Sequence, residues 1–426
     1  MIRRLEFNQG SGFDLILIPS SDYERRFAEI EAFLKTTTKM MHVQVEVVDR
    51  KIENEITGLK TELGPLTFDL ESIDLDNPTL ILNPTTWTQV ANIIFVDIPA
   101  GTGFSYAKTK DGWISSDTIL ANQASQFIKK FLLDHPKFFK NPLYIAGISY
   151  IGIVVPKIAL DLYEGNERGD QPSLNIQGYI LMSPLTDKFK DFNSRLEYTH
   201  RMALISDDIY KSAIKNCYGN YVSIDTTNSL CAKSLHQYEE CTSRIQMDNI
   251  LEPFCNENDE MSSCESDFDK AVGVWANKKD IQQALNIRQG KTGIFELINS
   301  TLHYNQGKND TFCYSYDIFS SFLYHKKLSC KNCQSLIMSG DHDMTFPYVG
   351  VEQWIASLNL GVEIPWKPFY VNGQVGGYKT KYVQNDYSLT YATVKGAGHL
   401  VPYNKPRETF SLLEMWLSSK FYLSDS

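Results

Sequence analysis

The chain has 426 residues, is 42% hydrophobic and carries a formal net charge of −10. This length and apolar content allow a large buried core, which one α/β domain carrying an insertion would use. The negative charge and the lack of a basic stripe argue against a nucleic-acid partner. No apolar run approaches the roughly 20 residues of a membrane-spanning helix, so we expect no membrane partner either.

Residues 1–57 have a different pattern from the rest of the chain. We expect a charged amphipathic helix over Asp22–Lys35 and a half-exposed strand over Met41–Val48. The apolar run Phe13–Pro19 is too short for the core of a signal peptide, so this sequence shows no signal peptide. We find no catalytic motif in this segment.

From Trp87 onward, strand patterns alternate with helical patterns, which is typical of an α/β sheet. In chain order, we expect a strand at Ile93–Val96, a helix from Ser116 or Asp117, and a buried strand in the apolar run 143–152 with a turn after it. A helix at Val154–Tyr163, strands at Ile176–Met182, Ser335–Ser339 and Leu389–Val394, and a final helix at Arg407–Phe421 follow. Residues 187–327 are helical and cysteine-bearing with no β run, which predicts a cap over the carboxyl ends of the strands.

A glycine-rich loop, Asp97–Tyr106, follows the first of these strands. Its glycines match neither Gly-x-Gly-x-x-Gly nor a phosphate loop that ends in Lys-Ser/Thr. The sequence therefore predicts no nucleotide cofactor.

Ser149 lies in Gly-Ile-Ser-Tyr-Ile-Gly, between a buried strand and a helical pattern. A sharp strand-to-helix turn would expose the hydroxyl and place a helix N-terminus behind it, where a developing oxyanion is stabilised. One such short match also occurs by chance, and a serine in a turn is often only a helix cap. We therefore read Ser149 as a candidate acyl-transfer nucleophile that needs partners.

Two later motifs supply those partners in the order that hydrolases use. Ser-Gly-Asp-His-Asp343 and Gly-Ala-Gly-His399-Leu-Val-Pro each follow an apolar run. An imidazole must accept the serine proton, and a carboxylate must hold the imidazole in the correct tautomer. Asp341 competes with Asp343 for the last role; we favour Asp343 and expect Asp341 to form an Asx turn.

The same motifs have less specific interpretations. Asp341-His342-Asp343 could be a polar loop, and His399 could be an ordinary exposed histidine. A metal cluster is the least favoured, because no other motif with ligand spacing accompanies these residues. We expect no metal and no other cofactor.

Five of the eight cysteines cluster in one polar stretch, at Cys217, Cys231, Cys241, Cys255 and Cys264. Such clustering predicts disulfides in an insertion. Asn299 and Asn309 begin Asn-x-Thr acceptor sequences, which matter only in a secreted protein and also occur by chance.

Several motifs together resemble the serine carboxypeptidase family over about residues 58–423: the segments around Ser149, Asp343 and His399, and Asp-Ile-Pro-Ala-Gly-Thr-Gly-Phe-Ser-Tyr106. The segments that begin at Ser183, His200, Ser339 and Pro347 resemble the plant serine carboxypeptidase-like acyltransferases more than the peptidases. Those relatives use 1-O-acyl-glucose esters as donors and pass the acyl group to an alcohol or to a second acylglucose.

This resemblance implies an α/β-hydrolase fold with a helical cap: an atypical segment 1–57, a core in two parts at 58–186 and 328–426, and an insertion at 187–327. It implies that Ser149 attacks the donor ester, His399 moves the proton and Asp343 orients His399. It also implies a vacuolar or secreted location; it gives no oligomeric state.

Further site assignments follow from the resemblance alone. The backbone N–H of Tyr150 would be one oxyanion donor, and the substrate would lie near Gly101, Thr102, Gly103 and Ile148. The cap disulfides would be Cys217–Cys231 and Cys255–Cys264, with Cys241 unassigned and Cys313 unpaired.

The chain departs from the family at three places. It has no Trp-x-x-Gly-Gly-Pro-Gly-Cys-Ser segment, which in relatives supplies a central strand and the second oxyanion donor, so we expect an incomplete central sheet unless Met41–Val48 fills the gap. Ile148 replaces the acidic residue that holds a substrate carboxylate in peptidases, and Ile151 replaces a small residue. An acyltransferase is the first hypothesis; a serine exopeptidase and an inactive remnant are the alternatives.

Overall fold

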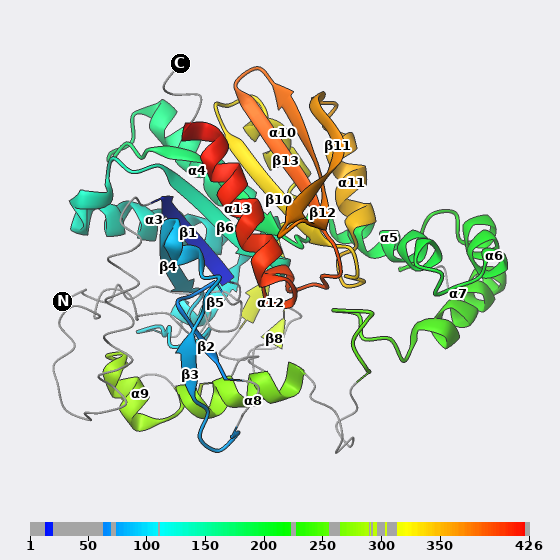
Figure 1. Ribbon diagram of the computed structural model, residues 1–426, viewed down its shortest axis with the longest axis horizontal. Coiled ribbons are helices and arrows are strands. Elements are labelled where there is room, and N and C mark those ends of the chain that lie inside the picture. Colours follow the sequence, from blue (N-terminus) through cyan, green and yellow to red (C-terminus); the bar gives the residue numbers. More distant parts are fainter. Residues whose placement is uncertain are drawn as a thin grey trace.

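The protein is built around one mixed β-sheet with helices on both faces and a helical insertion that extends to one side (Figure 1). We describe it from a computed structural model. The structure describes residues 13–19, 63–69, 74–109, 111–222, 227–254, 265–288, 290, 293–295, 303–304 and 313–421.

The eight-stranded sheet has the order β11-β12-β13-β10-β7-β6-β1-β4. Its strands are β1 (Phe13–Pro19), β4 (Ala91–Asp97), β6 (Leu143–Ile148), β7 (Ile176–Met182), β10 (Gln334–Gly340), β11 (Gly361–Val371), β12 (Gln374–Gln384) and β13 (Tyr387–Val394). Strands β6, β7, β10 and β13 are mutually parallel. Their carboxyl ends therefore meet at one edge of the sheet, where ligands of α/β proteins bind.

Strand β1 occupies the position between β4 and β6 and is antiparallel to both. Phe13 is opposite Asp97, and Asp14 is opposite Gly147. The expectation of an incomplete central sheet is therefore wrong, because an apolar heptapeptide from the N-terminal segment pairs with both neighbours and satisfies their backbone groups. The expected helix at Asp22–Lys35 and strand at Met41–Val48 lie outside the described residues.

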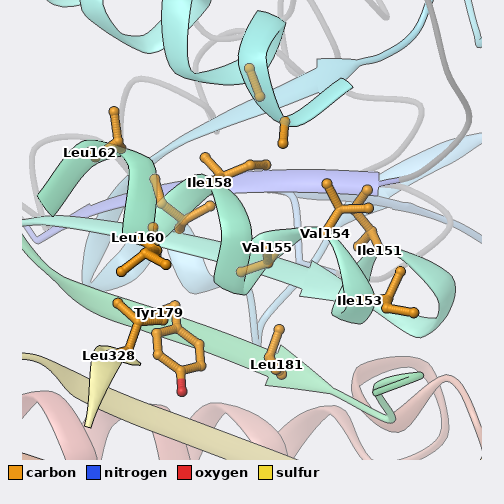
Figure 2. Close-up of a cluster of buried hydrophobic side chains, with 14 of the residues drawn as sticks. Ile151, Ile153, Val154, Val155, Ile158, Leu160, Leu162, Tyr179, Leu181 and Leu328 are labelled. Carbon is orange, nitrogen blue, oxygen red and sulfur yellow. The ribbon is translucent and has the colours of Figure 1, made fainter. Parts of the chain in front are cut away.

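Two hydrophobic layers cover the two faces of the sheet. One layer joins α3 (Asp117–Asp134), α4 (Val155–Arg168), α10 (Phe322–Leu328) and α11 (Tyr348–Ala356) to one set of strand side chains, and Figure 2 shows part of it. The other joins α13 (Pro406–Phe421) to the alternate set. In β7, for example, Leu181 belongs to the first layer and Ile180 to the second, as the two-residue period of a strand requires.

The insertion has two parts. Helices α5 (Lys188–Arg201), α6 (Asp207–Cys217) and α7 (Ser229–Thr242) lie beside the sheet, with α6 and α7 farthest from it (Figure 1). Helices α8 (Glu265–Ala276) and α9 (Lys279–Ala284) instead pack against the small sheet of β2 (Leu66–Phe68) and β3 (Leu80–Leu82). The insertion thus packs against two different parts of the core.

The prediction that residues 187–327 contain no strand is wrong. β8 (His303–Tyr304) and β9 (Cys313–Ser315) form a parallel three-stranded sheet with β5 (Ile114–Ser116). Strands of two or three residues are too short to show a hydrophobic period. The remaining elements are α12 (Val401–Asn404) and the 3₁₀ helices η1 (Trp87–Gln89), η2 (Asp111–Trp113), η3 (Pro136–Phe138) and η4 (Ser149–Ile153).

The predicted disulfide Cys217–Cys231 is confirmed and joins α6 to α7. Cys241 is a free, exposed thiol. Cys255 and Cys264 lie outside the described residues, as do Asn299 and Asn309. Among the helices that the structure describes, none is long and apolar enough to cross a membrane.

Candidate active site

Ser149 is the first residue of η4, directly after β6, and its φ is 66°. A positive φ is uncommon for a residue with a side chain and is strained, and such strain often marks a functional position. The carbonyl of Ser149 accepts a hydrogen bond of 3.1 Å from the N–H of Leu185, in the loop after β7. Two neighbouring strands thus fix the turn that exposes the Ser149 hydroxyl.

The turn is also fixed by close packing between Gly147 and Ile151. A Cβ atom on Gly147 would overlap Cγ2 of Ile151 and would lie 2.8 Å from Cγ2 of Val155. Both of these side chains are fully buried and belong to the layer that Figure 2 shows. The bulky Ile151, which is a departure from the family pattern, is accommodated because its neighbour on the strand has no side chain.

The structure brings Ser149, His399 and Asp343 together from the carboxyl ends of three strands. Nε2 of His399 lies 2.7 Å from the Ser149 hydroxyl, and Nδ1 lies 2.8 Å from Oδ2 of Asp343. His399 is only 6% exposed, so the reading of it as an ordinary surface histidine is wrong. This is the geometry in which an imidazole takes a proton from a serine while a carboxylate fixes its tautomer.

The two aspartates of the loop after β10 have distinct contacts. Oδ1 of Asp343 accepts hydrogen bonds from the N–H groups of Thr345 (2.7 Å) and Phe346 (3.1 Å), and this carboxylate is fully buried. Asp341 instead accepts from the N–H of Gly396 at 2.7 Å and pairs with His342. The expectation that Asp341 forms an Asx turn is therefore wrong: Asp343 makes that turn itself, and Asp341 joins its loop to the loop that carries His399.

Tyr150 is held by a buried carboxylate that the sequence did not single out. Its hydroxyl donates to Oδ1 of Asp117 at 2.5 Å, and the same oxygen accepts from Tyr314 at 2.7 Å. Oδ2 of Asp117 accepts from the N–H of Ile318 at 2.8 Å, with Lys188 3.8 Å away. Burial first, and then the neighbouring Tyr314 and Asp117, raise the pKa of Tyr150, so its phenol stays protonated as a donor.

Asp117 was difficult to identify beforehand. An acidic residue in the first turn of a helix, behind the N-cap Ser116, is expected for the helix dipole alone. Its partners lie 33 and 197 residues away along the chain. The role of the Tyr150 backbone N–H as an oxyanion donor stays a prediction.

The glycine-rich loop after β4 closes on Asp97. Oδ2 of Asp97 accepts from the N–H of Phe104 at 3.1 Å, and a Cβ on Gly103, whose φ is 53°, would overlap this carboxylate. Gly101 also has a positive φ, and its N–H donates to the carbonyl of Ser105. Because β4 is antiparallel to β1 and β1 to β6, this loop and Ser149 share one edge of the sheet.

The other two predicted substrate positions, Ile148 and Thr102, lie in different surroundings. Ile148 is 3% exposed and belongs to the core layer under α13, while Thr102 lies in the glycine-rich loop, where its N–H donates to the carbonyl of Pro99. The contribution of Gly101, Thr102, Gly103 and Ile148 to substrate binding stays a prediction.

The reversed direction of β1 has a consequence for the oxyanion site. A parallel strand in this position would send the loop after its carboxyl end to the edge that holds Ser149. In β1 the amino end, Phe13, lies at that edge, opposite Asp97, and Pro19 is opposite Ala91 at the far end. β1 therefore fills the strand position, but its carboxyl end, where the chain leaves the strand, lies at the edge far from Ser149.

The serine carboxypeptidase family profile matches residues 55–419. The chain is 41% identical to serine carboxypeptidase-like 16 of Arabidopsis thaliana over 367 residues, which cover 86% of this chain and 81% of that protein. It is 39% identical to serine carboxypeptidase-like 17 of the same plant, with 86% and 80% covered.

A solved structure resembles the fold. A prohormone-processing carboxypeptidase from Saccharomyces cerevisiae superposes with a TM-score of 0.65 at 14% identity, and the match covers 86% of this chain and 80% of that one. At this identity the likeness supports the α/β-hydrolase fold alone.

Proposed function

This chain belongs to the serine carboxypeptidase family, and on that premise we propose that it is an acyltransferase. It moves an acyl group from a 1-O-acyl-glucose ester to an alcohol through an acyl-enzyme on Ser149. The observation that carries the proposal is the hydrogen-bonded chain from Ser149 through His399 to Asp343, beside an apolar Ile148.

The proton transfers follow from this geometry. His399 Nε2 accepts the Ser149 proton as the hydroxyl oxygen attacks the donor carbonyl, and His399 then gives that proton to the departing glucose oxygen. The acceptor alcohol next gives its proton to His399 as its oxygen attacks the acyl-enzyme carbonyl. The bond from the acyl carbon to the Ser149 oxygen then breaks, and His399 returns the proton to that oxygen. Asp343 stays ionised and stabilises the imidazolium that forms in each half of the reaction.

Oxyanion stabilisation is the weaker part of this site. The N–H of Tyr150 serves as one donor, and the Asp117 contact with the Tyr150 phenol holds that residue in place. Loss of one oxyanion donor costs on the order of 100- to 1,000-fold in rate, about 3 to 4 kcal/mol. We therefore expect acyl transfer that is slow relative to a family member with both donors.

Ile148 favours an ester donor over a peptide. An exopeptidase must bind the charged carboxylate at the end of its substrate, and burying that charge without a hydrogen-bonding partner is costly. Ile148 has no polar atom in its side chain, and it lies within the core layer under α13. A donor that presents a neutral sugar avoids this cost.

Purified protein incubated with a 1-O-acyl-glucose and a labelled alcohol tests the proposal. We expect the transacylated ester to form, and to be lost in a Ser149→Ala variant. Hydrolysis without transfer would refute an acyltransferase, and release of C-terminal residues from a blocked dipeptide would identify an exopeptidase. If Ser149 fails to react with a fluorophosphonate probe, the protein is an inactive family member.

We also infer a vacuolar or secreted location. The inference rests on the family and on the Cys217–Cys231 disulfide, because disulfides persist in oxidising compartments. Transient expression of a fluorescent fusion in plant cells, scored against vacuolar and cytosolic markers, would test it.

A further inference from the structure

The segment 245–250, which follows α7, contacts both the loop that carries Asp343 and the loop that carries His399. The N–H of Met344 donates to the carbonyl of Met247 at 2.8 Å, and the N–H of Ile250 donates to the carbonyl of His342 at 3.1 Å. The insertion is thus joined to the Asp343 loop on both sides of that carboxylate by backbone hydrogen bonds.

Asp248, at the centre of this segment, contacts both loops. Its backbone carbonyl accepts the N–H of His399 at 2.5 Å, and its Oδ1 accepts the hydroxyl of Thr345 at 2.5 Å. The N–H of Thr345 in turn donates to Oδ1 of Asp343 at 2.7 Å. Asp248 therefore contacts both the backbone of His399 and Thr345, the residue whose N–H donates to the Asp343 carboxylate.

Close packing makes this contact specific. A Cβ on Gly398 would overlap the carbonyl oxygen of Asp248 and would lie 2.5 Å from Cβ of Asn249. The carbonyl of Thr345 also accepts two hydrogen bonds, of 2.7 and 3.1 Å, from the guanidinium of Arg195 on α5. Burial lowers the pKa of Arg195, but its guanidinium stays charged at neutral pH. A second helix of the insertion thus acts on the same residue.

We propose that Asp248 is a positioning residue that sets the His399–Asp343 geometry, and that the insertion is thereby coupled to the acylation step. The proposal rests on the function given above, because it assumes that Ser149 and His399 are the reacting pair. Displacement of a reacting group by about 1 Å can cost on the order of 100-fold in rate, so a small shift of either loop has a measurable effect.

The test compares variants by the second-order rate constant of Ser149 labelling with a fluorophosphonate and by the labelled fraction at completion. Asp248→Ala and Thr345→Val should each lower the rate constant about tenfold, and the double variant should be little slower than either, because both remove one interaction. Asp248→Asn keeps an oxygen acceptor and should stay within about threefold of wild type. Asp208→Ala, an exposed acid elsewhere on the insertion, is the matched control and should not change the rate.

Rate and labelled fraction separate positioning from folding. A purely structural role would lower the melting temperature or the labelled fraction but leave the rate constant of the folded protein unchanged, and that result would overturn the proposal. If Asp248→Ala fails to fold, Thr345→Val alone decides between a positioning role and a purely structural role.

Hydrogen exchange gives a readout that does not depend on activity. In Asp248→Ala and Thr345→Val, peptides that cover 341–347 and 396–402 should exchange faster, while peptides from α4 should not change. Unchanged exchange in both loops would refute the positioning role. Failure of the wild-type protein to label Ser149 would refute the proposed function instead, and the exchange measurement would still decide the role of Asp248.

Discussion

The two halves of the main sheet differ in how they are built. Strands β6, β7, β10 and β13 are parallel and covered on both faces, and they deliver Ser149, Asp343 and His399 to one edge. At the other side of β6, the antiparallel β1 joins β4 to the sheet. The three side chains of the proposed proton transfer, and the proposed Tyr150 oxyanion donor, thus follow strands of the parallel half, whereas the glycine-rich loop lies on the side where β1 is reversed.

The largest expected effect on activity comes from replacing Asp343, in the loop after β10. Asp343→Asn should lower turnover of a chromogenic ester by about 10⁴-fold, because the amide favours the wrong tautomer of His399. Asp341→Asn is the matched control and should cost less than about tenfold, since the Asp341 carboxylate contacts Gly396 and His342 rather than the His399 ring. Equal losses in the two variants would contradict the assignment of Asp343.

A second test addresses the buried polar groups behind the parallel strands. His325 on α10 contacts the Tyr179 hydroxyl at 2.8 Å and stacks on Trp354, and burial lowers its pKa from 6.5 to about 3. Between these values the unfolded chain binds a proton that the folded protein does not. The buried neutral imidazole therefore does not lower the free energy of unfolding above pH 6.5. As the pH falls from 6.5 toward 3, the free energy of unfolding decreases progressively, because only the unfolded chain binds the proton.

The measurement is urea unfolding at pH 7 and pH 4 of the wild type and of His325→Gln. Because one pKa unit corresponds to about 1.4 kcal/mol, the wild type should lose roughly 2 to 4 kcal/mol more than His325→Gln over this interval. His236→Gln, on the exposed side of α7, should keep the wild-type slope. If wild type and His325→Gln have the same slope, His325 is not a buried neutral imidazole.

The third prediction concerns the turn at Ser149. Gly147→Ala should destabilise the fold by up to about 3 kcal/mol, because the new methyl group would overlap Ile151. Combined with Ile151→Ala, the loss should be smaller than the sum of the two single losses. Additive losses in thermal unfolding would show that the two side chains do not compete for the same space.

The smallest effect is expected in β1. Ile16→Pro removes a backbone donor from a strand that is paired on both sides, and this should cost about 1 to 2 kcal/mol in urea unfolding. Ile16→Val keeps the donor and should cost less. If proline is tolerated as well as valine, β1 does not pair with β4 and β6 in solution.

The sequence predicted most of the parallel half and little of the other. β7 was predicted over its full range, β10 and β13 to within two residues at either end, and β6 from its first residue, because strands buried on both faces form continuous apolar runs between turns. β1 was missed, since a short apolar run has the same pattern whether it pairs in a sheet or not, and its partners lie more than 70 residues away.

The residues of the candidate site also differ in how far the sequence predicts them. Ser149, Asp343 and His399 have local motifs, and the structure brings these three side chains together. Asp117 and Asp248 have no such motif, because each acquires its contacts only through the fold. The hairpin of β11 and β12 was also missed; Pro365 and Pro368 interrupt the strand pattern in β11, at the edge of the sheet, where proline is tolerated.

The most direct test of the central claim is detection of the acyl group on Ser149. The protein is mixed briefly with a 1-O-acyl-glucose, quenched in acid and digested for mass spectrometry. We expect the acyl mass on the peptide that contains Ser149, absent in Ser149→Ala, and removed faster by an added alcohol than by water alone. No adduct on this peptide, or an adduct that decays at the same rate with and without the alcohol, would contradict an acyltransferase that uses Ser149.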